Sequence, residues 1–265
     1  VTLGGTGNGN FANKNVGNGK AVTVTGYTLG GADAGNYTIV QPTGVIANIT
    51  PANLAVTGVG ANNKVYDTTT TATLSGTAAV AALGGDVVTV GGAGSGTFAD
   101  KNVGNGKTVT VTGYTLGGAD AGNYTIAQPT GVTASITPAT LAVTGVGANN
   151  KVYDTTTTAT LNGAASITAL GGDVVTLGGT GSGTFADKNA GNGKAVTVTG
   201  YTLGGADAGN YVIAQPAGVT ADITRASLAV TGVNAQNKVF DGTTAATLGG
   251  TAAVAALAGD TVSVS

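Results

Sequence analysis

Residues 107–112 read Lys-Thr-Val-Thr-Val-Thr, and this stretch predicts a strand with one buried face. Successive side chains of a β-strand point to opposite faces, so the valines would face a core and the threonines would face solvent. β-Branched residues on both faces favour a strand over a helix. The stretch therefore predicts an all-β fold rather than a helical one.

A β-hairpin is expected immediately before this strand. The dipeptide Asn105-Gly106 suits a type I′ turn, because both residues accept a positive φ, so we expect it to join residues 96–99 to 107–112. After Thr112 the apolar positions change face unless the chain bulges. We predict a β-bulge at Gly113.

The neighbouring segments extend this pattern to a small sandwich. Residues 79–83 are compatible with either a helical turn or a strand, and the two glycines that follow fit both. Seven or eight strands separated by glycine-rich turns are typical of an antiparallel, immunoglobulin-like β-sandwich. The further strands that we expect are 54–59, 72–74, 87–90, 124–127 and 132–137.

The chain repeats itself with a period of 87 residues. Lys-Val-Tyr-Asp at 64–67 recurs at 151–154 and, as Lys-Val-Phe-Asp, at 238–241. Residues 52–138 and 139–225 differ at 14 of 87 positions, so the units are near copies. A coil of a β-solenoid repeats at about 20 to 30 residues, whereas this period suits a small sandwich domain.

Unit boundaries are placed after Pro51, Pro138 and Arg225, which occupy equivalent positions. We therefore predict the C-terminal part of a unit at 1–51, complete units at 52–138 and 139–225, and the N-terminal part of a unit at 226–265. The next strand begins two residues after each boundary. Linkers this short would limit bending between neighbours.

The segment Gly-Ala-Asp-Ala-Gly-Asn-Tyr is the most specific local signal. It is similar to the tyrosine corner of immunoglobulin-like domains, in which the phenol bonds backbone a few residues upstream; an ordinary turn followed by a surface tyrosine is the alternative. The residues to which we assign a structural role are Asp33, Tyr37, Asp120, Tyr124, Asp207 and Tyr211.

These motifs together resemble the YDG-type repeat. The carrying residues are Lys-Val-Tyr-Asp before a threonine-rich stretch, Phe-Ala-Asp-Lys-Asn, Gly-Ala-Asp-Ala-Gly-Asn-Tyr and a closing Ile-Thr-Pro-Ala. The third letter of the family's name is a glycine; Gly242 keeps it, while Thr68 and Thr155 replace it, which puts the geometry of that turn in question. The resemblance implies a haemagglutinin-like exoprotein or adhesin of Gram-negative bacteria, often exported by two-partner secretion, at the cell surface or in the biofilm matrix.

Composition excludes several classes of function. Charged residues make up 8% of the chain, against about 25% in ordinary soluble domains, and the net charge is -2. No basic patch is available for nucleic acid, and no run of 18 apolar residues predicts a membrane span. His and Cys are absent. Because no nucleophile with an activating base can be assembled, we expect no enzyme activity and no cofactor.

Two sites remain as alternatives to simple turns. Calcium would need several carboxylates close together, yet the acids of the first complete unit are at least 14 residues apart. We therefore interpret these aspartates as turn residues and expect no metal site. An isopeptide cross-link between Lys64 and an asparagine would strengthen a fibre, but no motif aligns with it.

We hypothesise a structural role, in which the repeats form an extended stalk or matrix filament that holds an adhesive tip away from the cell. The expected partners are adjacent repeat units and other copies of the fibre; the tip ligand is unknown. The alternative is a binding module whose neutral Thr/Asn-rich face binds glycans, ice or itself. For the chain ends, the sequence suggests an excerpt from a longer array, or a subunit that docks head to tail by strand addition.

Overall fold

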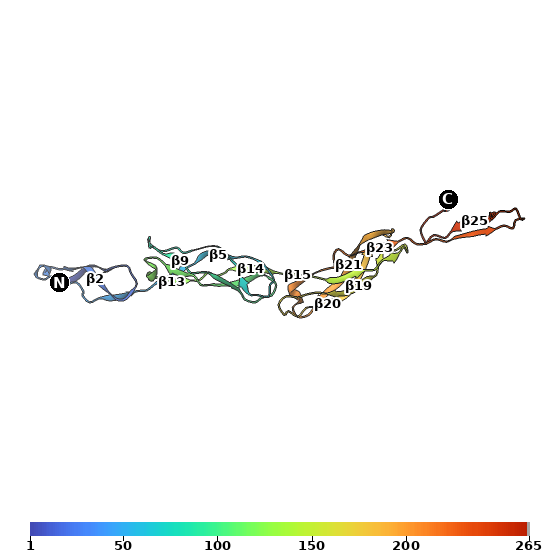
Figure 1. Ribbon diagram of the computed structural model, residues 1–265. Helices are drawn as coiled ribbons and strands as arrows, with labels where there is room; N and C mark the ends of the chain where they lie inside the picture. Colours follow the sequence, from blue (N-terminus) through green and yellow to red (C-terminus); the bar gives the residue numbers. More distant parts are fainter. Residues whose placement is uncertain (264–265) are drawn as a thin grey trace. The chain divides into compact units, whose positions relative to one another are not determined.

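The computed structural model describes residues 1–263, and it is an all-β protein (Figure 1). The described residues form two compact units. The first comprises Val1–Val65 and Thr69–Thr137, and the second comprises Tyr66–Thr68 and the residues from Pro138 onward. Short 3₁₀ turns interrupt the strands at η1 (Ala34–Asn36), η2 (Ala121–Asn123) and η3 (Ala208–Asn210).

The strands of the two units follow one another closely along the chain. Those of the first unit are β1 (Thr2–Phe11), β2 (Gly17–Gly30), β3 (Ile46–Ile49), β4 (Ala52–Ala55), β5 (Thr57–Ala61), β6 (Lys64–Val65), β7 (Thr71–Ala72), β8 (Leu74–Ala79), β9 (Thr89–Gly91), β10 (Ser95–Phe98), β11 (Gly104–Thr112), β12 (Thr115–Gly117), β13 (Tyr124–Ala127) and β14 (Thr133–Thr137). Those of the second unit are β15 (Ala139–Ala142), β16 (Thr144–Ala148), β17 (Lys151–Val152), β18 (Thr158–Ala159), β19 (Leu161–Ser166), β20 (Thr176–Phe185), β21 (Gly191–Gly204), β22 (Tyr211–Ala214), β23 (Thr220–Thr224), β24 (Val230–Ala235) and β25 (Leu248–Val254).

Each unit contains a five-stranded sheet of the same topology. The strand order is β6-β14-β11-β10-β7 in the first unit and β17-β23-β21-β20-β18 in the second. Most pairs are antiparallel, but β6 pairs parallel to β14, and β4 pairs parallel to β13. In both parallel pairs a strand near the start of a repeat lies beside one near its end. These pairings close each repeat into a folded unit.

The alternation at 107–112 has the predicted consequence. Val109 and Val111 are buried, whereas Thr108, Thr110 and Thr112 are exposed. In the second unit the equivalent valines pack with Phe185 and Ile223, and residues of β16 and β19 lie against this cluster. The core is therefore formed between the five-stranded sheet and a separate hairpin, as in a two-layer β-fold.

The hairpin before β11 is present, but the prediction that Asn105-Gly106 forms its turn is wrong. The connection spans 99–103, where Asp100 Oδ1 accepts the backbone N–H of Asn102 at 2.8 Å and Lys107 Nζ at 2.5 Å. Asn105-Gly106 lies within β11, at a register shift in its pairing with β14, and Gly106 has a φ of 58°. An aspartate turn therefore makes the hairpin, and the Asn-Gly pair makes a bulge.

The irregularity predicted at Gly113 is confirmed, with one difference. Ser95 pairs with Thr112 and Gly91 with Thr115, so three residues of the partner segment face two. The extra residue is therefore on the partner segment, not at Gly113 itself. Gly113 has a φ of 92°, and a Cβ there would lie 2.4 Å from a carbonyl oxygen of that segment, so glycine is required.

Residues 79–83, for which helix and strand were both open, are mostly neither. Strand β8 ends at Ala79, and Val80–Leu83 carry no regular structure. The chain then turns, and the backbone N–H of Asp86 donates to the carbonyl oxygen of Leu83 at 3.0 Å. This turn brings the Asp86 side chain out of the sheet.

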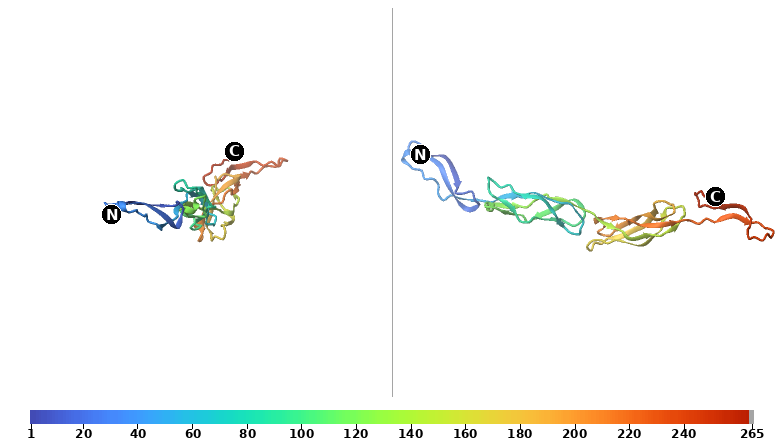
Figure 2. Two further views of the ribbon diagram at one scale, coloured as in Figure 1. Left: turned by 90° about the vertical axis from the view of Figure 1, so that its left-hand side faces the viewer. Right: turned by 45° about the horizontal axis from the view of Figure 1, so that its top comes forward.

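The partial repeats at 1–51 and 226–265 form strand ribbons. Strands β1, β2 and β3 make a three-stranded sheet, and β24 pairs with β25 (blue and red in Figure 2). Phe11 is 38% exposed, whereas the equivalent Phe98 is 2% exposed. Within these ribbons, aromatic side chains at core positions of the repeat are thus not fully buried.

Candidate functional site

In the two complete repeats the side chain of the aspartate of Gly-Ala-Asp-Ala-Gly-Asn-Tyr bonds a distant segment of backbone and not its own turn. Asp120 precedes η2 without a side-chain cap, and its Oδ2 accepts the backbone N–H of Val87 at 2.8 Å. Asp207 accepts the N–H of Val174 at the same distance. Asp33 precedes η1, where its carbonyl oxygen accepts from the turn. In the two complete repeats the aspartate therefore connects the 3₁₀ turn to the segment just before β9 or β20, more than 30 residues earlier in the chain.

The tyrosine of the same motif is held by two long-range hydrogen bonds. The Tyr124 hydroxyl accepts the N–H of Leu83 at 3.1 Å and donates to Asp86 Oδ2 at 2.7 Å. The geometry differs from the tyrosine-corner expectation, because the backbone partner lies 41 residues upstream rather than a few. Tyr124 is the first residue of β13, and its phenol reaches the 83–86 loop. Tyr37, in the first partial repeat, is exposed.

Tyr211 has the same partners one repeat later. Its hydroxyl accepts the N–H of Leu170 at 3.1 Å and donates to Asp173 Oδ2 at 2.7 Å. A second phenol, that of Tyr66, donates to the same oxygen at 2.6 Å. The two rings meet edge to face, with centroids 5.4 Å apart and an interplanar angle of 77°, a favourable aromatic geometry.

The aspartate at this position accepts side-chain donors in all three copies. Asp86 Oδ1 pairs with the ammonium of Lys14. Asp260 Oδ2 accepts the Tyr153 hydroxyl at 2.6 Å, and its Oδ1 accepts Lys188 Nζ at 3.0 Å. We call Asp86, Asp173 and Asp260 the acceptor aspartates. Each is a charged oxygen acceptor for phenol or ammonium donors, and such charge-assisted bonds are stronger than neutral ones.

These bonds shift the ionisation of both kinds of partner. Lys14, and after it Tyr124, lowers the pKa of the Asp86 carboxyl, and Tyr153 with Lys188 lowers that of Asp260. Burial, and after it the Asp173 carboxylate, raises the pKa of Tyr211 to about 12. The Asp86 and Asp260 carboxylates are thus ionised and the Tyr211 phenol is protonated at neutral pH. In this arrangement the carboxylate is the hydrogen-bond acceptor and the phenol is the donor.

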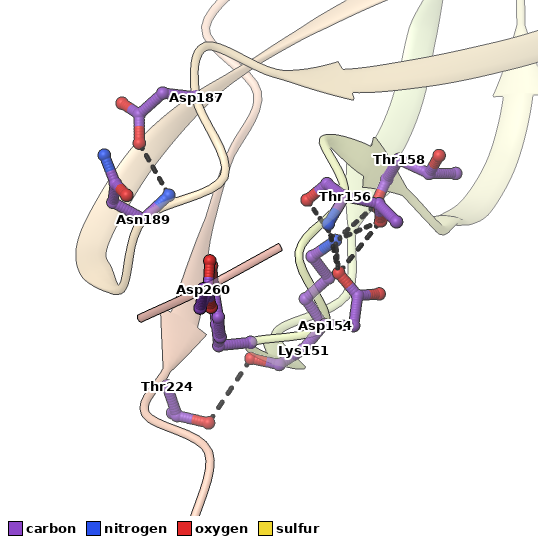
Figure 3. A network of polar contacts seen from close by, with 9 residues as sticks. Lys151, Asp154, Thr156, Thr158, Asp187, Asn189, Thr224 and Asp260 are labelled. Carbon is purple, nitrogen blue, oxygen red and sulfur yellow. Dashed lines mark hydrogen bonds and ion pairs between the residues drawn. The ribbon is translucent and has the colours of Figure 1, made fainter. Parts of the chain in front are cut away.

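A second polar cluster orders the turn after Lys-Val-Tyr-Asp. Lys151 Nζ donates to Asp154 Oδ1 at 2.8 Å and to the carbonyl oxygens of Thr156 and Thr158 at 2.8 and 3.0 Å (Figure 3). The ammonium also lies 5.5 Å from the centroid of the Phe185 ring. It lowers the pKa of Asp154 to about 2. Oxygen acceptors and a ring face thus surround the Lys151 ammonium.

The residue after the aspartate of this motif has a left-handed backbone in each copy. Its φ is 69° at Thr68, 67° at Thr155 and 75° at Gly242. The question raised by the two threonines is therefore resolved, since they adopt the conformation that glycine has at 242. A β-branched residue in this region is strained.

The sequence of this repeat matches a known family. The YDG domain matches the chain four times, over residues 1–44, 50–131, 137–218 and 224–265. The chain belongs to the YDG domain family. No curated protein and no solved structure matches it. The resemblance inferred from the Lys-Val-Tyr-Asp and Gly-Ala-Asp-Ala-Gly-Asn-Tyr motifs is thus confirmed, and the protein contains tandem YDG domains.

The acceptor aspartates of these YDG domains were not singled out from the sequence. Asp86 was interpreted as a turn residue, although its recurrence at 173 and 260 was visible. The missing information was the identity of its partners, which lie 38 to 107 residues away. Gln128 was missed for the same reason: its side chain bonds both the N–H and the carbonyl oxygen of Tyr114, as a neighbouring strand would.

The acidic side chains of these YDG domains lie apart from one another. Within 1–263, no three acidic side chains come together in a group that could hold a metal ion. The acceptor aspartates instead bond phenol, ammonium or backbone donors. Within the same residues, no helix is long and apolar enough to cross a membrane.

Proposed function

We propose that these tandem YDG domains are a structural segment, a stalk or matrix filament, of a secreted bacterial surface adhesin. In this role they extend a binding tip from the cell and support adhesion or biofilm formation. The proposal includes an extracellular location, at the cell surface or in the matrix, and no enzymatic activity. Its partners are adjacent repeat units and other copies of the fibre.

The observation that carries the proposal is that the ionic and phenolic side chains bond one another within repeats and between neighbouring repeats. Asp86, Asp173 and Asp260 accept bonds from tyrosines and lysines, and Lys151 is enclosed by oxygens and a ring. In these near-identical copies the ionic and phenolic groups bond other residues of the array, and each added copy adds length. The use of these side chains in structural bonds, repeated in each copy, fits a spacer better than a catalyst.

The test is the growth of molecular length with repeat number. We would extend the chain by one and by two further copies of residues 139–225 and measure small-angle scattering from all three proteins. Strands of roughly ten residues rise about 3.3 Å per residue, so each copy should add about 35 to 40 Å to the maximum dimension. A maximum dimension that scarcely changes would contradict a stalk.

The binding-module alternative has its own readout on the same proteins. Binding of the unextended chain to a glycan array, or inhibition of ice growth by it, would favour recognition by the repeat surface itself. A spacer gives neither signal, and its length still increases with each copy.

A further inference from the structure

We propose that each acceptor aspartate is the site at which one YDG domain binds the domain before it. The partner is another copy of the repeat, which supplies the tyrosine of its Lys-Val-Tyr-Asp motif and the lysine of its Phe-Ala-Asp-Lys motif. Phe11-Ala12-Asn13-Lys14 is the first copy of that second motif. The inference concerns binding between repeats and holds whether or not the array carries an adhesive tip.

The tyrosine donor comes from the preceding repeat in two independent copies. Tyr66 donates to Asp173, and Tyr153 donates to Asp260, each at 2.6 Å. Both pairs are separated by 107 residues, which is longer than the 87-residue period. The bond therefore runs from one repeat to the next and not within one. Tyr66–Thr68 accordingly belong to the compact unit that contains Asp173.

The lysine donor also comes from the preceding repeat. Lys14 pairs with Asp86 in the first unit, and Lys188 pairs with Asp260 at 3.0 Å in the second. Beside Lys14, the backbone N–H of Val16 donates to Asn123 Oδ1 at 2.9 Å. Phenol, ammonium and backbone donors thus all point from one copy to acceptors on the next.

Of the two kinds of donor from the preceding repeat, the tyrosine is more buried than the lysine and contributes more to binding. Tyr66 is 2% exposed and Tyr211 7%, and their rings are in contact, so both hydroxyls reach Asp173 from buried rings. The Asp173 carboxylate is itself only partly buried, and the loss of one of its two phenol donors still removes a charge-assisted hydrogen bond. The exposed lysine pairs contribute less, because solvent screens them. The site therefore selects a tyrosine at the end of the preceding Lys-Val segment.

A cleft of about 310 Å³ lies beside the Asp260 carboxylate. Tyr153 and Ala190 line it from one repeat, and Leu257 lines it from the next. The equivalent cleft beside Asp86, about 330 Å³, is lined by Val16 and Leu83. The acceptor oxygen is therefore flanked by apolar walls from two copies, as expected of an interface between repeats.

The experiment measures amide hydrogen exchange of Leu170 in the full chain. This N–H donates to the Tyr211 hydroxyl, which shares Asp173 with Tyr66. If Tyr66 binds the next repeat, Tyr66→Phe should speed exchange at Leu170 by about tenfold or more, as expected for one hydrogen bond to a charged group. Tyr114→Phe is the matched control, since it removes a hydroxyl from the same repeat as Tyr66, away from Asp173.

A double-mutant cycle then assigns the effect to the pair. In urea unfolding, Tyr66→Phe and Asp173→Asn should be non-additive by about fivefold or more in the unfolding equilibrium constant. The cycle of Tyr66→Phe with Asp187→Asn should be additive. Unchanged exchange at Leu170 in Tyr66→Phe would overturn the proposal, and so would an additive Tyr66/Asp173 cycle. Should Asp173→Asn fail to fold, the Leu170 measurement in Tyr66→Phe decides.

Discussion

Thr68 and Thr155 are strained residues that are held in place by their neighbours. Both have φ near 70°, where a β-branched side chain crowds the backbone. After Thr155 the turn is closed by Asp154 Oδ1, which accepts the N–H and the hydroxyl of Thr156, both at 2.9 Å. These bonds and the Lys151 ammonium offset the strain locally. Glycine would adopt the same turn without that cost.

We therefore expect Thr155→Gly to stabilise the protein. Relief of a left-handed conformation yields about 1 to 2 kcal/mol, and the added freedom of glycine in the unfolded chain removes about half of that, leaving about 0.5 to 1 kcal/mol. Urea unfolding measures the change. Thr157→Gly is the control, because Thr157 does not have a positive φ, and it should destabilise. Destabilisation by Thr155→Gly would show that the threonine side chain compensates for its backbone.

At the scale of elements, the bulge between β20 and β21 depends on a glycine facing a tyrosine. Gly179 pairs with Tyr201 and Ser182 with Thr199, which leaves the extra residue on β20. A Cβ at Gly181 would lie 2.5 Å from the Tyr201 hydroxyl oxygen. The ring thus lies directly over a position where no side chain fits. Gln215 completes the arrangement by bonding the Tyr201 backbone.

Gly181→Ala should therefore displace the Tyr201 ring and destabilise the protein by about 1 to 3 kcal/mol, the usual cost of overpacking. Gly209→Ala is the matched control, because a Cβ there would meet nothing within 4 Å. Thermal unfolding of both variants decides. Equal melting temperatures for Gly181→Ala and the unsubstituted chain would mean that the ring moves aside freely.

Among the elements, features with a local sequence signal were predictable, and features that depend on a distant strand were not. Strand β11 and the irregularity at Gly113 were predictable, because alternation and a glycine at a change of face are local signals. Asn105-Gly106 was assigned the wrong role, because its preference for positive φ is satisfied equally by a turn and by a bulge. The distinction depends on pairing with β14, about 30 residues further along, which no dipeptide encodes.

At the scale of the whole molecule, the period was predictable but the bonds between repeats were not. Spacing of 87 residues identifies near copies, and the recurrence of Asp86 at 173 and 260 is visible in the sequence. The Tyr153 hydroxyl bonds Asp260, which lies in a turn of the next repeat. The sequence of a single repeat does not encode this contact. Repeat proteins derive stability from such neighbour contacts as well as from each unit.

Aspartates and a tyrosine govern the pH dependence of the whole chain, which has no histidine. The folded-state pKa values of Asp86, Asp154 and Asp260 are lowered, so the stability from their bonds is present above about pH 4 and is lost as pH falls toward 2. The pKa of Tyr211 is raised to about 12, so its contribution is present below about pH 10 and is lost as pH rises through 12.

Between these limits nothing that we have described titrates, and the melting temperature should be flat from about pH 5 to pH 9. Calorimetry across pH 2 to 12 measures this, with a fall expected on both sides. In Tyr66→Phe/Asp173→Asn the alkaline fall should begin at lower pH, because Tyr211 then faces no carboxylate and the folded pKa moves toward that of a free phenol. A maximum within the neutral range would contradict this account, since it would require a group that titrates there.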